Sequence, residues 1–235
     1  MRDNMNATAI HDFVTGKISN KTLFIYLAMV LGTFLAFLLA ALAVYPGTYS
    51  MLTNAISNLG NHELNPFPGW LLFSVGLWIF GPTTLPIFFY QFRALKPVLK
   101  WAACIFLACS ITSSAGMIGV GIFSEDMNFP LHVAFAAMAF GGMVLAAIFS
   151  WFSIMAMAIK EKTARTRKIL AGTLVFMMTI LIIVAATIGS LYIDIHSLDI
   201  AEDSLPSIEL WEWIFFFTLA SQTIFLTALI NLPHA

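Results

Sequence analysis

Three histidines lie in the polar segments that separate or flank long apolar runs: His62, His132 and His196. Most carboxylates lie in the same segments. Three imidazoles, with an acid nearby, can hold a zinc ion or another divalent metal and leave one position open for a water molecule, as in a metal-assisted hydrolase. No pair of these histidines has the spacing of a metal-binding motif, so their meeting depends on how the polar segments fold.

A wider candidate site combines hydroxyl, amide, imidazole and carboxylate side chains from these segments. Its members are Ser57, Asn58, Asp126, His132, Asp194, His196, Glu209 and Glu212. His132 opens an apolar segment, and a helix N-terminus favours neutral imidazole, which accepts a proton or binds a metal. The alternative is that His132 only hydrogen-bonds the loop before it. Glu209 and Glu212 are also explained by the helix dipole alone, and no catalytic residue set follows from these residues.

The chain that must position these residues is strongly apolar. Of its 235 residues 60% are hydrophobic and 10% charged, and its mean hydropathy is +0.90, whereas a soluble domain is about 45–50% apolar. A helix needs about 20 apolar residues to cross a bilayer core of about 30 Å. Six continuous stretches reach that length: residues 23–45, 70–90, 101–123, 131–159, 169–193 and 207–230. The sequence predicts an all-α membrane protein, a six-transmembrane-helix bundle forming one domain over 23–230.

The basic residues predict the orientation of this bundle. All 11 Lys and Arg residues lie in three segments, residues 1–22, 91–100 and 160–168. Because cytoplasmic loops carry the excess of Lys and Arg, both the N-terminal segment 1–22 and the C-terminal tail 231–235 are predicted to be cytoplasmic. We therefore expect an integral, multi-pass protein of the cell (plasma) membrane, with its histidine-containing segments at the outer face.

The longest outer segment, Ser50 to Trp70, is rich in Asn and Pro. In its first part Leu52, Ile56 and Leu59 share helical spacing, which predicts a short amphipathic helix that Gly60 ends as a left-handed cap. We expect this helix to form an outer lid between the first two transmembrane helices.

The third apolar stretch combines serines with Gly116, Gly119 and Gly121. Small and hydroxyl residues let helix backbones approach closely in a membrane. This stretch is therefore predicted to be the most enclosed helix and to contact Gly141 and Gly142 of the next one.

Three short motifs resemble a known family. They are Ile56-Ser57-Asn58-Leu59-Gly60 followed by Asn65-Pro66, Gly116-Met117-Ile118-Gly119, and His132 at the start of the fourth helix. In this order they resemble the six-pass membrane family named for the Frag, DRAM and Sfk proteins and its prokaryotic relative, domain of unknown function 998. Many relatives have Asp where Asn58 stands. The resemblance implies a lipid-associated role and carries over no catalytic residues.

Three functions remain open from the sequence. The first is a non-catalytic membrane component that binds membrane lipids or a partner membrane protein, with no nucleic acid and no certain cofactor. The second is the metal-assisted lipid-modifying hydrolase, with zinc or another divalent metal on His62, His132 and His196. The third is a small-solute transporter, although no ionisable side chain lies in the middle of any predicted span, where transporters usually keep them. The first hypothesis requires least of the residues, so the protein is more simply not an enzyme.

Overall fold

The computed structural model describes residues 10–197 and 208–231; residues 184, 187–197 and 208 are described by their backbone only. Within these ranges it contains six long apolar helices and no strand: α2 (Asn20–Ala43), α3 (Gly69–Leu95), α4 (Lys100–Ile122), α5 (Phe129–Lys160), α6 (Ala164–Ser197) and α7 (Ile208–Asn231). Each matches one predicted span to within a few residues at its ends. The predicted six-helix membrane bundle is therefore confirmed.

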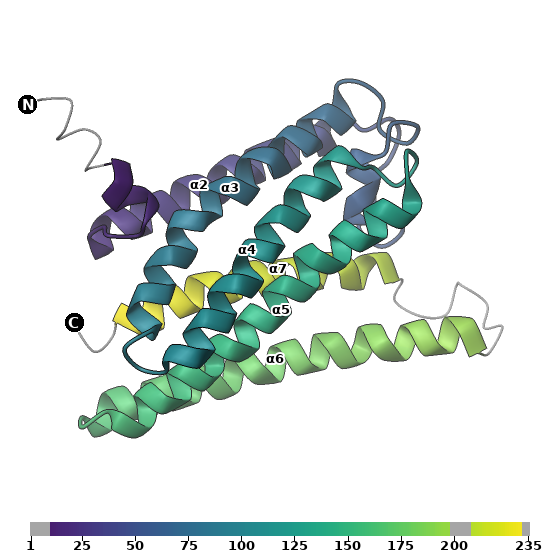
Figure 1. The fold of residues 1–235 in the computed structure, drawn as a ribbon. Coiled ribbons are helices and arrows are strands. Elements are labelled where there is room, and N and C mark those ends of the chain that lie inside the picture. The colour runs from purple at the N-terminus through teal and green to yellow at the C-terminus, as the bar shows by residue number, and fades with distance from the viewer. Residues whose placement is uncertain (1–9, 198–207, 232–235) are drawn as a thin grey trace, which may run out of the picture.

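The helices run side by side along the length of the molecule (Figure 1). The most extensive contacts join α4 to α5 and to α3, and α2 packs on α3. Helix α7 contacts α6, α5 and α3. Helix α2 begins and α7 ends at one end of the bundle, while the segment before α3 and the turn between α4 and α5 lie at the other, which we call the outer end (Figure 1).

Helices α4 and α5 approach most closely at glycines. A methyl group on Gly116 would lie 2.8 Å from the Cα of Ala139, and one on Gly142 would lie 2.8 Å from the carbonyl oxygen of Cys109. Between these points the Ser113 hydroxyl donates to the Ala139 carbonyl at 2.7 Å. The predicted contact through Gly142 is confirmed. The one through Gly141 is wrong, because open space surrounds its Cα.

Helix α4 is not the most enclosed helix, contrary to the prediction. In its most apolar window 39% of the residues are buried, against 56% in α3. The reason is that α3 packs against α2, α4 and α7, whereas the other face of α4 carries exposed apolar residues such as Ile105 and Ile111.

Towards the inner end, polar side chains join α3 directly to α7. The amide of the fully buried Gln91 donates to the Thr227 hydroxyl at 2.9 Å and to the Thr223 carbonyl at 3.2 Å. Next to it the Tyr90 hydroxyl donates to the Asn231 side chain at 2.8 Å. These bonds hold α3 and α7 together near the C-terminal ends of both helices.

The predicted amphipathic lid helix is wrong in form. The segment contains only a short 3₁₀ helix, η1 (Ile56–Gly60), and Gly60 is not among the glycines with positive φ. The carbonyl of Asn54 accepts bonds from the Tyr49 hydroxyl and from the Trp213 indole N–H, and the carbonyl of Ala55 accepts a second bond from Tyr49. These contacts tie the backbone before η1 to Tyr49 and to α7, and the Ala55 carbonyl also accepts the Asn58 N–H that begins η1.

Candidate functional site

At the outer end, the segment before α3 is joined to the α4–α5 turn by a hydrogen-bonded His–Asp pair. The Nδ1 atom of His62 lies 3.1 Å from the Asp126 carboxylate and 2.9 Å from the Ser124 hydroxyl, and the His62 backbone N–H donates to Asp126 at 3.2 Å. The imidazole also lies against the ring of Trp70, with centroids 4.2 Å apart. Two predicted site residues that are 64 positions apart in the sequence thus meet. We call this cluster the outer latch.

Partial burial by itself would raise the pKa of Asp126. The hydrogen bonds from Ser124 and from the His62 backbone, together with the nearby imidazole, outweigh it and hold this pKa below its usual value. A carboxyl group with a lowered pKa stabilises the fold above its unfolded pKa, and loses that contribution as the pH falls through its folded pKa. The latch should therefore open in acid.

We expect Asp126→Asn to lower the free energy of unfolding by about 0.2–1 kcal/mol, the range of a solvent-exposed ion pair. The variant should also lose part of the wild-type decline of stability in acid, because it has no carboxylate to protonate. Thermal unfolding of the detergent-solubilised protein, from neutral pH down through the folded pKa of Asp126, measures both effects. Glu63→Gln, which removes an exposed carboxylate next to His62 in the segment before α3, is the control. If it changed stability as much as Asp126→Asn, the latch would be contradicted.

Asn65 and Gly69 hold the loop between η1 and α3 in place. The Asn65 side chain is fully buried and donates to the Leu59 carbonyl at 2.9 Å and more weakly to the Ala41 carbonyl at 3.4 Å. Its amide lies so close to Gly69 that any side chain on Gly69 would overlap with it. Asn65 is a structural residue that was missed as such in the sequence, where the Asn65-Pro66 pair indicated only a turn.

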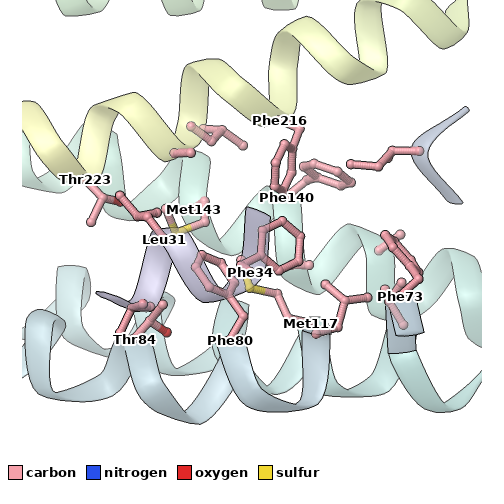
Figure 2. A pocket seen from close by; sticks show the side chains of 18 of the residues that line it. Leu31, Phe34, Phe73, Phe80, Thr84, Met117, Phe140, Met143, Phe216 and Thr223 are labelled. Atoms are coloured by element: carbon pink, nitrogen blue, oxygen red, sulfur yellow. The ribbon is translucent and has the colours of Figure 1, made fainter. Parts of the chain in front are cut away.

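Beneath this outer loop lies an elongated apolar cavity, lined by α2, α3, α4, α5, α7 and η1. Its volume is about 90 Å³, several times the roughly 10–15 Å³ that one water needs on the same measure. Figure 2 shows aromatic and aliphatic side chains that point into it, among them Phe34, Phe140 and Phe216. An apolar cavity of this kind stays dry unless an apolar group fills it.

Three polar side chains line the outer end of the cavity: Ser57 from η1, His132 from α5 and Glu212 from α7. All three belong to the predicted candidate site. The Glu212 carboxylate accepts a hydrogen bond from the backbone N–H of Ile56, and the carboxylates of Glu125 and Glu209 are close enough to repel it. The cavity therefore has one polar end and a long apolar body.

His132 is 7% exposed, and its Nδ1 lies 2.9 Å from the carbonyl oxygen of Phe123. Because a carbonyl only accepts, Nδ1 carries the hydrogen and donates it. The predicted bond between His132 and the loop before it is thus confirmed. Nε2 has no hydrogen-bond partner among the described residues, and the side chain lines the cavity.

Helices α2 and α7 border the cavity without packing closely on each other, although each packs on α3. The rings of Phe34 and Phe216 bridge them, with centroids 5.5 Å apart. Leu31 on α2 and Ala220 on α7 line the cavity and are partly exposed. We call this boundary the α2–α7 seam.

The remaining predicted site residues lie apart from the cavity or beyond what is described. Asn58 and Glu209 are partly exposed and do not line the cavity. Asp194 and His196 fall in the last turns of α6, where side chains are outside the described residues. Where side chains are described, no three His, Cys, Asp or Glu residues gather as a metal site would require. The set of His62, His132 and His196 stays a prediction.

Six apolar helices, five of which line an internal cavity, define this chain as a polytopic helical membrane protein. Residues 28–229 match the model of the family described as "Protein of unknown function (DUF998)", and the chain belongs to this family. The match runs from within α2 to within α7, so it includes the outer latch and every residue that lines the cavity except Leu27. Neither the curated proteins nor the solved structures contain a match. The further likeness to the Frag, DRAM and Sfk proteins stays a prediction.

Proposed function

We propose that this protein binds a membrane lipid, without catalysis, by holding one of its hydrocarbon chains in the cavity. The carrying observation is a long, mainly apolar cavity whose ionisable lining residues, His132 and Glu212, lie with Ser57 at one end. The other polar lining residues are two threonines, Thr84 and Thr223, and the Thr84 hydroxyl already donates to the Gly81 carbonyl of its own helix. A lipid has the same polarity, with a polar head and an apolar chain.

The length of the cavity supports this proposal. Its lining runs along α5 from His132 to Met143 and along α7 from Glu212 to Thr223. At about 1.5 Å per residue these eleven steps span roughly 16 Å. One leaflet is about half of a bilayer core of about 30 Å, so a single chain from the outer leaflet has a suitable length.

The α2–α7 seam supplies a route. A chain that enters between two membrane helices goes from one apolar environment into another and never crosses water. The bridging rings of Phe34 and Phe216 have to move apart for this, whereas the Gln91 bonds keep α3 and α7 joined further in. Binding of lipid from within the membrane fits an integral multi-pass protein in the plasma membrane, with its basic loops in the cytoplasm.

Filling the cavity should abolish binding. In Ala220→Phe a ring replaces a methyl group on the cavity wall at the seam. We expect the molar ratio of co-purified lipid to protein, measured by mass spectrometry, to fall at least tenfold. Ala228→Phe introduces the same ring on an exposed position of the same helix and should leave the ratio unchanged. Equal lipid in both variants and in the wild type, with folding verified by circular dichroism, would refute lipid binding in the cavity.

A further inference from the structure

The apolar body of the cavity provides little selectivity. A hydrocarbon chain that leaves the bilayer for the cavity gains almost nothing from the hydrophobic effect, because lipid tails are as apolar as the side chains that replace them. Discrimination between lipids must come from the polar end. What the polar end of the cavity recognises is inferred on the basis of the proposed function.

The polar end offers hydrogen-bond acceptors. His132 uses its Nδ1 hydrogen on the Phe123 carbonyl, so in the neutral imidazole Nε2 is left as an acceptor. This atom belongs to a side chain that is more than nine-tenths buried, lines the cavity and has no protein partner at Nε2 among the described residues. A hydrogen-bond donor on a ligand in the cavity would give this acceptor a partner.

The charges around this end are negative. Glu212 lines the cavity, and Glu125 and Glu209 lie within electrostatic reach of it. No Lys or Arg lies in the outer segments of the sequence, since all 11 occur in residues 1–22, 91–100 and 160–168. Ser57 is the one lining group at this end that can either donate or accept. An anionic head group would meet acidic side chains and no Lys or Arg that could balance its charge.

We propose that the cavity selects a single-chain amphiphile or lipid whose head group donates hydrogen bonds, an alcohol or an ammonium, and rejects carboxylate and phosphate heads. The head would donate to Nε2 of His132 and to the Glu212 carboxylate, while the chain follows α5 and α7 inward.

Four probes with the same chain test this selection: hexadecanol, hexadecylammonium, palmitate and hexadecyl phosphate. Native mass spectrometry of the full-length protein in detergent at neutral pH measures the fraction bound. We expect hexadecanol and hexadecylammonium to bind at least tenfold more tightly than palmitate and hexadecyl phosphate. Binding of hexadecanol alone would identify the alcohol as the donor, and binding of hexadecylammonium alone the cation; either result supports the proposal.

Glu212→Gln separates charge from shape. The variant should lose most of the preference for hexadecylammonium over palmitate, about tenfold, and should still bind hexadecanol. Glu63→Gln, which removes an exposed outer carboxylate, should keep the wild-type order. If palmitate or hexadecyl phosphate bound as well as hexadecanol, and Ala220→Phe blocked that binding, the head-group selection would be refuted. Lipid binding in the cavity would still be supported. If all four probes bound and Ala220→Phe left their binding unchanged, the proposed function itself would be refuted.

Discussion

Gly116→Val should unfold the bundle or prevent its assembly. The Cα of Gly116 faces the backbone of α5, where even a methyl group would lie 2.8 Å from the Cα of Ala139. Backbone atoms in the middle of a helix cannot give way as a flexible side chain does, so the two helices would have to separate. We expect a loss of about 3 kcal/mol or more, at the upper end of the range for overpacked cores. Thermal unfolding in detergent, with the yield of monodisperse protein, measures it.

Gly141→Ala is the matched control for this prediction. Gly141 lies in the adjacent helix α5, and a methyl group added there would contact nothing within 4 Å. Replacing a helical glycine by alanine at an open position stabilises by up to about 1 kcal/mol. The two variants should thus have effects of opposite sign. If Gly116→Val unfolded at the wild-type temperature, the close α4–α5 contact would be refuted.

The helices could be predicted from the sequence because the bilayer imposes one simple requirement on them. A span must be apolar over about 20 residues, and six stretches satisfy it with polar residues between them. The structure places its six helices on these stretches. The sequence likewise predicted a helix that starts near His132, and Asn128 caps that helix by accepting a bond from the Leu131 N–H.

The outer lid could not be predicted in the same way. Periodicity in the residues before Gly60 favoured an amphipathic helix. In the structure this stretch is held by tertiary contacts of two aromatic side chains, Tyr49 and Trp213, which donate to the carbonyls of Asn54 and Ala55. Trp213 is 159 residues away from Asn54, so no local sequence pattern indicates this contact.

The sequence predicted one candidate site from residue types alone, whereas the structure places its members in two separate groups. His62 and Asp126 form the outer latch, whereas Ser57, His132 and Glu212 line the cavity. The sequence supplied the residues because polar groups near apolar spans are few. It could not supply the division, since that depends on which loops and helices lie side by side. The apolar lining of the cavity was not predicted at all, because its Phe, Leu and Met residues have the same pattern as an ordinary packed core.

We expect the buried Asn65 amide to be the main polar contact that holds η1 above the cavity. Asn65 reaches the carbonyls of Leu59 and Ala41 and so joins the end of η1 to the outer end of α2. Ser57 of η1 lines the polar end of the cavity, and Ile56 of η1 binds the Glu212 carboxylate. A substitution at Asn65 should therefore disturb the polar end of the cavity, although Asn65 itself does not line the cavity.

Asn65→Asp should destabilise the protein by at least about 2 kcal/mol and release η1. The new carboxylate has nearly the same shape but loses both N–H donors, so the buried Leu59 carbonyl loses its bond from residue 65 and faces a second acceptor. An unsatisfied buried acceptor costs about 1–3 kcal/mol, and more where charge is involved. Thermal unfolding measures the loss, and faster hydrogen exchange at the Leu59 and Gly60 amides should show that η1 is released.

Asn58→Asp makes the same chemical change seven residues earlier, on a partly exposed side chain of η1 that does not line the cavity. It should unfold within about 0.5 kcal/mol of the wild type, the range of surface substitutions. Because the family resemblance implies Asp at this position in many relatives, this control also tests whether Asn58 matters to stability. Similar losses in both variants would mean that added negative charge at the outer end, and not the lost Asn65 donors, destabilises the protein. Wild-type exchange at Leu59 in Asn65→Asp would show that η1 is held by its apolar contacts alone.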